Sequence, residues 1–346
     1  MFFKDVFMFL KLIDVSLCHI CNMKMIISLS LILFLSLRLS AQDTTMVMFW
    51  NLENFFNYHD DGGGEADTEF SSFGSRHWTR KRFYAKCNAI AKTVLWVGSC
   101  RGRLPDVIGF AEVEDRFVLD KLVYGTALKK FDYGIVHFDS PDPRGIDVAL
   151  LYRKSVFSVA SSSRCPIVNP DSAGPPLLTR DILAVRLLRS GASDTASIAF
   201  VVNHHPSKYG GGRTDWRREV AIVKLEAVCD SLSGCGVNSI VAMGDFNDTP
   251  ENGLFERLSP SLVNVALPMS RKGIGSIKFN GKWELIDLFF VSSDLVSCSG
   301  MEVLKVPFLM VRDKSHSGEK PLRTFSGPRY MGGVSDHCPV LLVISR

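Results

Sequence analysis

Several motifs that identify common enzyme classes are missing from this chain of 346 residues. The stretch GVSDH has no closing glycine, so the G-x-S-x-G elbow of serine hydrolases is absent. The run YGGGRTDW lacks the G-K-[ST] of a nucleotide-binding P-loop. Outside the N-terminal leader described below, no two cysteines stand in C-x-x-C spacing. The sequence therefore gives no support for a serine hydrolase, a P-loop enzyme or a cysteine-bound zinc site.

A strong charge of either sign is also lacking, since the formal net charge is only +4. That value is too small to indicate a nucleic-acid-binding protein by itself, but it is compatible with an anionic substrate. The chain is 46% hydrophobic and 22% charged, a globular composition with ample material for a large core. After residue 42 there is no repeat, no low-complexity linker and no change in composition. Residues 42–346 are therefore predicted to form a single domain.

The N-terminal segment has the order of features typical of a secretory signal. A lysine precedes an apolar run from Met25 to Leu37, and small residues follow at Ser40-Ala41. The run is short for a bilayer span, and Arg38 interrupts it. We predict that residues 1–41 are a leader and signal peptide. The product would be exported to the periplasm or the extracellular space without a stable membrane span, and an uncleaved anchor is the alternative.

Seven cysteines remain after the leader, scattered and odd in number. An oxidising compartment would allow one or two disulfides, with Cys229–Cys235 as a candidate pair. Buried free thiols are the other interpretation, and the sequence leaves both open.

Short apolar runs separated by turns predict a series of strands. Several runs are apolar on both faces, as expected of strands inside a covered sheet. The runs are TTMVMFW, DVIGFAEV, GIDVALLY, DILAVRLL, SIAFVVNHH, NSIVAMGDF, ELIDLFFVS and CPVLLVIS.

Helices are expected at two places, where apolar residues recur at steps of three and four. The first predicted face consists of Phe83, Cys87, Ile90, Val94 and Val97. The second consists of Trp216, Val220, Val223 and Ala227, with Thr214-Asp215 as the N-terminal cap. Many strands with intermittent helices favour two packed sheets with helices outside.

The stretch YHDDGGGEADTEFSSFG, residues 58–74, is polar and rich in glycine. We expect a mobile, solvated surface loop, with calcium binding by its acidic residues as the alternative.

Polar side chains end or precede five of the apolar runs. They are Asn51, Glu112, His204, the pair Asp245 and Asn247, and the pair Asp336 and His337. Each alone fits a turn or a structural histidine. Together, the carboxylates and carboxamides supply the hard oxygens that Mg²⁺ or Mn²⁺ prefers. The histidines and an aspartate add proton transfer and charge stabilisation, so the set suits attack of water on phosphorus.

The motifs GDFN and SDH, supported by AEVE, RGIDVALLY and KWELIDLFFVS, resemble the endonuclease/exonuclease/phosphatase superfamily over about residues 45–345. That superfamily includes pancreatic-type deoxyribonuclease, sphingomyelinases and inositol-polyphosphate phosphatases. The resemblance implies a four-layer α/β/β/α sandwich, in which two packed mixed β-sheets are flanked by helices.

The resemblance also implies a divalent cofactor, Mg²⁺ or else Mn²⁺ or Ca²⁺. Glu112 would be the principal metal ligand with Asn51 beside it. Asp336 would lie close to the metal or to a second ion.

Further roles follow from the same resemblance. Asp245 and Asn247 would position the attacking water and a phosphate oxygen, with Asp245 as candidate base. His337 would bind the scissile phosphate and be oriented by Asp287, because a carboxylate on one ring nitrogen fixes the tautomer of the other. His204 would hold the opposite side of the phosphate.

The stretch NHHPS leaves one alternative open. His204 begins the H-x-x-S spacing, whereas a shift of one residue along the strand would place His205 in the site. Asp147 is a candidate to orient His204, and Arg144 is a candidate phosphate contact. We therefore predict that both residues take part in substrate binding.

Substrate classes are ordered by the loops expected near the strand ends. The basic and aromatic stretches KYGGGRTDWRR, RKGIGSIKFNGKW and KPLRTFSGPRY favour a nuclease or broad phosphodiesterase. A phosphomonoesterase comes second and a lipid phosphodiesterase third, because no apolar hairpin for membrane contact is apparent. The alternative of another class is a catalytically inactive, exported binding module. No protein partner is indicated, and we expect a monomer.

Overall fold

The computed structural model describes residues 44–62, 64–191, 197–208, 215–259 and 261–345. Residues Thr45–Ile344 form one compact unit. The predicted leader and signal peptide lie outside the described residues. No helix in the described part of the chain has the length and apolar character needed to cross a bilayer.

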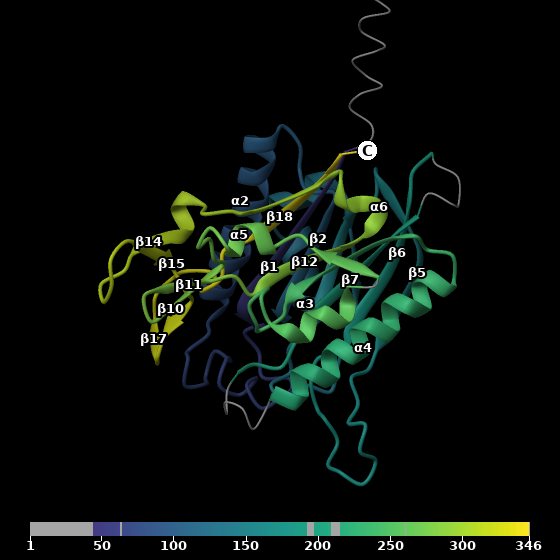
Figure 1. The fold of residues 1–346 in the computed structure, drawn as a ribbon. Helices are drawn as coiled ribbons and strands as arrows, with labels where there is room; N and C mark the ends of the chain where they lie inside the picture. Colours follow the sequence, from purple (N-terminus) through teal and green to yellow (C-terminus); the bar gives the residue numbers. More distant parts are fainter. Residues whose placement is uncertain (1–43, 63, 192–196, 209–214, 260, 346) are drawn as a thin grey trace, which may run out of the picture. The chain divides into compact units, whose positions relative to one another are not determined.

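Two six-stranded sheets form the centre of this unit (Figure 1). The first sheet has the order β13 (Ser299–Val303), β18 (Val340–Ser345), β1 (Thr44–Phe55), β2 (Val107–Val113), β4 (Asp147–Arg153) and β3 (Tyr133–His137). The second has the order β5 (Phe157–Cys165), β6 (Ile182–Arg189), β7 (Ser197–His204), β8 (Ser239–Asp245), β12 (Asp287–Ser292) and β9 (Leu262–Asn264). Both sheets are mixed: β1 pairs parallel with β2 and β7 with β8, whereas β4 and β12 pair antiparallel with their neighbours.

The two sheets pack face to face through apolar side chains contributed by both. Phe49 of β1 and Leu150 of β4 belong to the same cluster as Phe200, Met243 and Phe289 of the second sheet. All eight predicted strands are present, and β7 and β8 are buried along their whole length. Strands covered on both faces read as continuous apolar runs, which is why the sequence revealed them.

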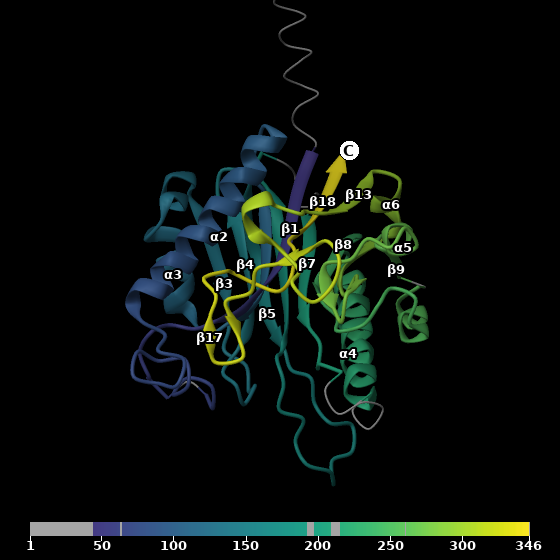
Figure 2. The same ribbon diagram turned by 90° about the vertical axis from the view of Figure 1, so that its left-hand side faces the viewer.

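Helices cover the outer face of each sheet. In Figure 2, α2 (Arg80–Arg101) and α3 (Arg116–Tyr124) lie on one side of the strands and α4 (Asp215–Gly234) on the other. A cluster containing Phe83 and Val118 joins α2 and α3 to the first sheet, and one containing Leu225 joins α4 to the second. The predicted four-layer arrangement of helices and two mixed sheets is confirmed.

Helix α2 follows its predicted pattern. Thr79 caps it by accepting a hydrogen bond from the backbone of Arg82 at 3.4 Å, and Gly102 ends it in the left-handed conformation, with φ of 72°. All five predicted apolar residues of this helix are buried.

Helix α4 exists where it was predicted, but the buried face is wrong. Trp216 and Val223 are 39% and 41% exposed. The face that packs on the second sheet includes Ala221, Ile222 and Leu225 instead. Both faces carry apolar residues at helical spacing, so the spacing alone could not distinguish them. The predicted cap residue Thr214 lies outside the described residues.

The segment 58–74 corrects the expectation of a loose, solvated loop. Asp67 is buried, and Phe70 packs on Phe56 with ring centroids 4.8 Å apart. Trp78 follows, and its indole Nε1 donates to the backbone oxygen of Phe56 at 2.8 Å. A few aromatic anchors therefore fix a segment whose average composition is polar.

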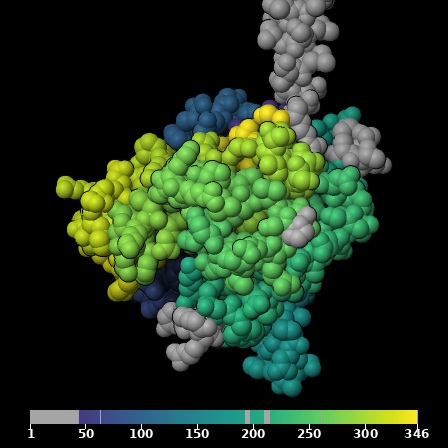
Figure 3. All heavy atoms as spheres, in the orientation of Figure 1, coloured from purple at the N-terminus to yellow at the C-terminus, as the bar shows by residue number. Residues whose placement is uncertain are grey.

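Short elements complete the unit, and no sequence pattern indicated them. They are η1 (Ala127–Phe131), η3 (Gly253–Leu258), α5 (Leu267–Ser270), α6 (Ser293–Val296), η4 (Pro307–Leu309), and the hairpins β10 (Ile277–Phe279) with β11 (Lys282–Glu284), β14 (Met310–Arg312) with β15 (Glu319–Pro321), and β16 (Phe325–Ser326) with β17 (Arg329–Tyr330). Figure 3 shows that the second half of the chain forms most of the face in view, with the C-terminal hairpins at one edge.

The seven described cysteines are all free thiols. Cys229 is buried and Cys235 is exposed, so the candidate disulfide between them is not formed. The interpretation as free thiols holds for the described residues.

Candidate active site

The polar residues that end the apolar runs meet at one place, although they come from both sheets. Parallel pairing of β1 with β2 sets Asn51 opposite Ala111, one residue before Glu112. Parallel pairing of β7 with β8 sets His204 opposite Asp245, and antiparallel pairing sets Asp287 of β12 opposite Asp245 as well. Strand register therefore sets Asn51 beside Glu112 in the first sheet, and both His204 and Asp287 beside Asp245 in the second.

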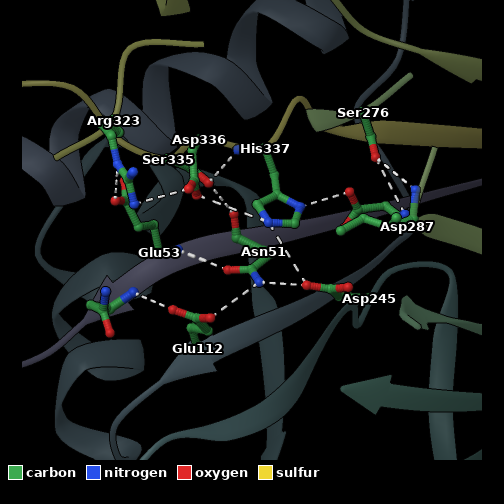
Figure 4. Close-up of polar contacts among 12 residues, drawn as sticks. Asn51, Glu53, Glu112, Asp245, Ser276, Asp287, Arg323, Ser335, Asp336 and His337 are labelled. Carbon is green, nitrogen blue, oxygen red and sulfur yellow. Dashed lines mark hydrogen bonds and ion pairs between the residues drawn. The ribbon is translucent and has the colours of Figure 1, made fainter. Parts of the chain in front are cut away.

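Asn51 connects the acids of the two sheets. Its Nδ2 lies 3.0 Å from Asp245 Oδ2 and 3.4 Å from Glu112 Oε1 (Figure 4). Its Oδ1 accepts a hydrogen bond from the backbone of Glu53 at 2.9 Å. In this arrangement Asn51 holds two carboxylates together and does not present a free oxygen, so its role as a metal ligand stays a prediction.

The backbone around these residues adopts an uncommon conformation. Glu53, Asn54, Glu112 and Asn247 have positive φ angles of 48°, 54°, 58° and 49°. Non-glycine residues in the left-handed region cost about 1–3 kcal/mol each and persist where the surroundings hold them. Here the turn aims the backbone N–H of Asn54 at Glu112 Oε2, 2.8 Å away. Such strain is concentrated at functional sites in many proteins.

An acid–imidazole–acid arrangement lies at the centre of the cluster. His337 Nδ1 is 2.7 Å from Asp287 Oδ2, and His337 Nε2 is 3.8 Å from Asp245 Oδ2. All three side chains are buried. Asp287 thus contacts Nδ1 of His337, and Nε2 is directed at Asp245. This is the orienting contact between Asp287 and His337 that the sequence predicted.

Neighbouring groups fix His337 in the arrangement of Figure 4. Ser335 Oγ accepts a hydrogen bond from the backbone N–H of His337 at 3.0 Å. The indole Nε1 of Trp50, which the figure does not label, donates to the backbone oxygen of His337 at 2.9 Å. Ser276 Oγ accepts from the backbone N–H of Asp287 at 3.3 Å. The segment before β18 is therefore tied to β1 and to the start of β12.

The structure places His204 in the cluster and turns His205 away. His204 Nε2 lies 3.8 Å from both Glu112 Oε1 and Asp245 Oδ2. The ring of His205 packs on Phe246, with centroids 4.7 Å apart, and neither of its nitrogens has a hydrogen-bond partner. Adjacent residues in a strand face opposite sides, so only one of the two can reach the site.

Asn247 lies at the end of β8, and its side chain is used locally. Its backbone N–H donates to Asp245 Oδ1 at 2.8 Å, and its Nδ2 donates to the backbone oxygen of His205 at 2.9 Å. It therefore holds Asp245 and joins the ends of β7 and β8.

Asp147 does not orient His204, contrary to the prediction. Asp147 Oδ2 lies 3.1 Å from His137 Nε2, and Asp147 Oδ1 accepts from the backbone of Ser140 at 2.9 Å. His204 Nδ1 has no hydrogen-bond partner. Asp147 begins β4, and its side chain is directed to the neighbouring strand β3 and the loop after it.

Arg144 lies beside the cluster, on the rim of a pocket of about 390 Å³. Two further arginines, Arg180 and Arg217, line the same pocket with Ser207. The charges of Arg180 and Arg144 both reach His204. Asp142 lines the pocket as well and lies 3.0 Å from Arg180 and 3.7 Å from Arg144, so the three arginines outnumber one acid and the pocket is basic overall.

Arg180 is a residue that the sequence reading missed. It is buried and donates through Nη2 to the backbone oxygen of His205 at 2.7 Å, while Nη1 pairs with Asp142 Oδ2 at 3.0 Å. The only sequence feature that could have indicated Arg180 is its position directly before the apolar run of β6. Its partners Asp142 and His205 are distant in sequence, so no local pattern links them to it.

A second missed group surrounds Glu53. Arg323 Nε pairs with Glu53 Oε1 at 2.8 Å, and Arg323 Nη2 pairs with Asp336 Oδ2 at 3.0 Å. The buried Lys86 donates through Nζ to the backbone oxygen of Glu53 at 2.5 Å. These contacts hold the strained turn after Asn51 and neutralise part of the charge on Asp336.

The electrostatic environment separates the two histidines of the cluster. Burial, with the charges of Arg180 and Arg144, lowers the pKa of His204 well below its ordinary value. Burial opposes the charged form of His337 too, but the carboxylates of Asp287 and Asp245 outweigh it and raise its pKa well above the ordinary value. His204 is therefore neutral and His337 is positively charged near pH 7.

Asp245 is the carboxylate with the most altered titration in the cluster. Burial raises its pKa to about 7, an effect that the charge of His337 opposes and that of Asp287 strengthens. A carboxyl group that titrates near neutrality is suited to exchange a proton with water.

The donor set fits a hard divalent cation. Glu112 and Asp336 offer carboxylate oxygens that are partly open to solvent, whereas Asp245 and Asp287 are buried. Mg²⁺ keeps several waters and binds through one or two protein carboxylates. Asp245, Asp287 and His337 bring ligand atoms within 4.8 Å of one another, and Glu112 and Asp336 are the more open carboxylates of the cluster.

Sequence comparison identifies one family. A family model described as the endonuclease/exonuclease/phosphatase family matches residues 46–346. No curated protein sequence matches the chain.

Solved structures with the same fold share little sequence with this chain. The catalytic domain of human nocturnin with bound sulfate is 17% identical, covers 87% of this chain and 94% of its own length, and has a TM-score of 0.54. Truncated TDP2 from Caenorhabditis elegans is 16% identical, with 88% and 98% covered and a TM-score of 0.56. The mannosyl-6-phosphatase of Bacteroides thetaiotaomicron is 16% identical, with 87% and 99% covered and a TM-score of 0.54. At these identities the likeness establishes the fold.

Proposed function

Since the chain belongs to the endonuclease/exonuclease/phosphatase family, we propose that it is a divalent-metal-dependent hydrolase that cleaves phosphoester P–O bonds by in-line attack of water. The observation that carries the proposal is the position of Asp245. Its Oδ2 lies 3.8 Å from the Nε2 atoms of both His204 and His337 and 3.0 Å from Asn51 Nδ2. A base, two imidazoles and an amide thus surround one small volume.

The imidazoles are placed to bind a phosphoryl group. A separation of 3.8 Å is too long for a hydrogen bond, so neither Nε2 is bound to Asp245. Each can donate to a phosphoryl oxygen between them. His337 adds positive charge, and this charge stabilises the transition state as negative charge accumulates on the phosphoryl oxygens.

Asp245 is the proposed base and Asn247 its support. The carboxylate accepts a proton from the attacking water, and the backbone N–H of Asn247 at 2.8 Å keeps its Oδ1 in place. Neutral His204 faces the opposite side of the phosphoryl group and donates a hydrogen bond to the leaving oxygen, which takes its proton from solvent water as the P–O bond breaks. Glu112 and Asp336 would hold the cation, with Asn51 between the acids. When bound, a divalent cation supplies positive charge at the phosphoryl oxygens.

Phosphodiesters, with nucleic acid first among them, are the proposed substrate class. Exposed Arg271, Lys272 and Lys282 are available on the loops around β10 and β11. Other cations of these stretches are already neutralised, since Lys278 and Lys320 both lie 3.2 Å from Asp313 oxygens. This limited supply of free cations is enough to hold a short nucleic-acid segment or another small phosphodiester.

A phosphomonoester is the second candidate, and the arginine-lined pocket favours it. Arg144, Arg180 and Arg217 could receive the rest of a small anionic substrate beside the catalytic cluster. A solved structure of the same fold is named as a mannosyl-6-phosphatase. A lipid phosphodiester remains third in the proposed order.

One panel of substrates tests these proposals. Purified enzyme would be assayed on bis-p-nitrophenyl phosphate, plasmid DNA, RNA, sugar phosphates and sphingomyelin, with Mg²⁺, Mn²⁺ or Ca²⁺ and with EDTA. We expect metal-dependent hydrolysis that is strongest on a phosphodiester and is lost in Asp245→Ala and His337→Ala variants that remain folded. Absence of hydrolysis from the whole panel would favour an inactive binding module, and normal rates in either variant would defeat the assignment.

Export is proposed from the N-terminal sequence. Cleavage after residue 41 would release a monomeric single domain, residues 42–346, into the periplasm or extracellular space. N-terminal sequencing of the secreted or periplasmic protein would identify the first residue. Full-length protein retained in the membrane fraction would support the anchored form instead.

A further inference from the structure

A second group of acids, separate from the catalytic cluster, lies where the segment after β1 meets the residue after β2. Asp61, Asp67 and Glu114 each bring one carboxylate oxygen within 4.8 Å of the oxygens of the other two. Asp67 is 1% and Glu114 is 5% exposed, whereas Asp61 is open to solvent. Acids on the surface often gather without a ligand, but two of these three are buried.

Glu114 shows why this group points to a ligand. Its Oε2 accepts a hydrogen bond from the backbone of Asn57 at 2.6 Å. Its Oε1 is buried and has no hydrogen-bond partner. A buried carboxylate oxygen without a donor is costly, and like charges around it increase the cost.

The segment that carries the other two acids is held in a fixed turn. Asp67 Oδ2 accepts from the backbone N–H groups of Asp61 and Gly62 at 2.9 and 2.7 Å. Gly62 has φ of 82°, which suits glycine at this close turn. Asn57 Nδ2 donates to Asp61 Oδ2 at 3.0 Å. The chain thus directs Asp61 back toward Glu114, so little rearrangement is needed to gather the carboxylates around an ion.

We propose that Asp61, Asp67 and Glu114 form a calcium-binding site that is independent of the catalytic cation. Carboxylate oxygens with one side open to water suit Ca²⁺, which accepts six to eight oxygen ligands, waters included, in flexible geometry. Zn²⁺ would require nitrogen or sulfur ligands, which this group lacks. The exposed position of Asp61 gives the ion access, and a calcium ion provides the missing partner of Glu114 Oε1.

A bound ion would also support the neighbouring wall of the arginine-lined pocket. The backbone N–H of Glu65 donates to the oxygen of Pro143 at 2.7 Å. A Cβ added to Gly64 would lie 2.5 Å from the backbone nitrogen of Gly145. The acidic turn is therefore packed directly on the segment that carries Arg144. We expect calcium to stabilise the two segments together.

Calcium binding to chelator-treated full-length protein tests the site, because calorimetry measures it without any hydrolysis. The Glu112→Gln variant replaces the principal ligand of the proposed catalytic cation and weakens that site, so a calcium affinity that is unchanged in this variant reports on the second site. In this background we expect binding to persist and thermal unfolding to shift to higher temperature with Ca²⁺. Adding Asp61→Asn should weaken the affinity by about tenfold or more, because one of three charged ligands is lost.

Asp60→Asn is the matched control, since Asp60 is an adjacent exposed acid outside the group. It should bind calcium as the parent does. Glu114→Gln should also lose calcium binding, while its circular dichroism spectrum in EDTA stays that of the parent. If Glu114→Gln misfolds, the Asp61→Asn variant decides the test, because Asp61 is exposed and its substitution does not disturb the core. Equal affinity in the Asp60→Asn and Asp61→Asn proteins would overturn the proposal. Loss of binding in Glu112→Gln alone, or binding of Mg²⁺ but not Ca²⁺, would overturn it too. None of these results depends on whether the protein hydrolyses a phosphoester.

Discussion

His337 is held between two acids, with its Nδ1 2.7 Å from Asp287 Oδ2 and its Nε2 3.8 Å from Asp245 Oδ2. The short contact fixes the ring, and the long one leaves Nε2 available to a third group. This difference in distance is the basis of the first prediction.

Asp287→Asn should reduce kcat by about 10²-fold or more, in the range of a lost acid–base contribution. The amide keeps the size of the side chain but removes the charge that holds the pKa of His337 above its ordinary value. Steady-state kinetics on bis-p-nitrophenyl phosphate across pH would test this. The activity that remains should also decline at a lower pH than in the wild type, as His337 loses its proton earlier. An unchanged kcat and pH profile would show that Asp287 has no such role.

Glu112→Gln should raise the metal concentration needed for half-maximal rate by about tenfold or more, since a carboxylate ligand is replaced by a neutral amide. The measurement is a Mg²⁺ titration of the rate after EDTA treatment. Glu219→Gln, an exposed position on α4, is the control and should titrate as wild type does. Superimposable titrations for all three proteins would exclude Glu112 as the principal ligand.

His204 and His205 provide a neighbouring pair with opposite expectations. His204→Asn should lower kcat by about 10²-fold or more, because its Nε2 faces the reaction volume. His205→Phe should leave kcat within a few-fold of wild type, since that ring packs on Phe246 and only its backbone oxygen meets the site. Comparable losses in the two variants would mean that strand placement does not separate their roles.

The strands and most of the cluster could be predicted from the sequence because burial leaves a local signal. A strand covered on both faces is a continuous apolar run, so a polar residue at its end is conspicuous. Asn51, Glu112 and Asp245 are of this kind. Strand pairing sets Asn51 beside Glu112 in the first sheet, and the packing of the two sheets brings Asp245 of the second sheet to them. His204 was favoured over His205 on spacing, and the structure places it in the cluster.

Features that depend on distant partners were not predicted or were assigned wrongly. Asp147 lies at a strand end like the others, yet it pairs with His137 of a strand that the sequence reading did not include. The apolar residues of α4 satisfy helical spacing on two faces, and only packing on the second sheet selects the one with Ala221 and Ile222. Arg180 acts through the backbone of His205, which leaves no pattern in the sequence.

Arg144→Ala should raise KM by about fivefold or more with a smaller change in kcat, for a substrate whose anionic part enters the pocket. Arg144 lies on the pocket rim and contacts none of the proposed reacting groups, so its interaction is the same in ground and transition states. Arg116→Ala, on the exposed surface of α3, is the matched charge control. A decrease confined to kcat would instead place Arg144 in the chemical step.

The pH dependence of stability should reveal His205. Burial, together with the charges of Arg180 and Arg218, lowers the pKa of His205 from 6.5 to about 3 in the folded protein. In the unfolded chain His205 therefore binds a proton below about pH 6.5, whereas in the folded protein it binds that proton only below about pH 3. The contribution of neutral His205 to the free energy of unfolding is fully present above pH 6.5 and is lost as the pH falls toward 3.

His205→Phe removes the titrating ring while keeping an aromatic neighbour for Phe246. From pH 7 to pH 5 the wild type should lose about 2 kcal/mol more free energy of unfolding than this variant, given about 1.4 kcal/mol per pH unit at full slope. Urea unfolding at both pH values measures the difference, and His204 is present in both proteins, so its own lowered pKa cancels in the comparison. If the two proteins lose stability in parallel, His205 must bind its proton in the folded state nearly as well as in the unfolded chain.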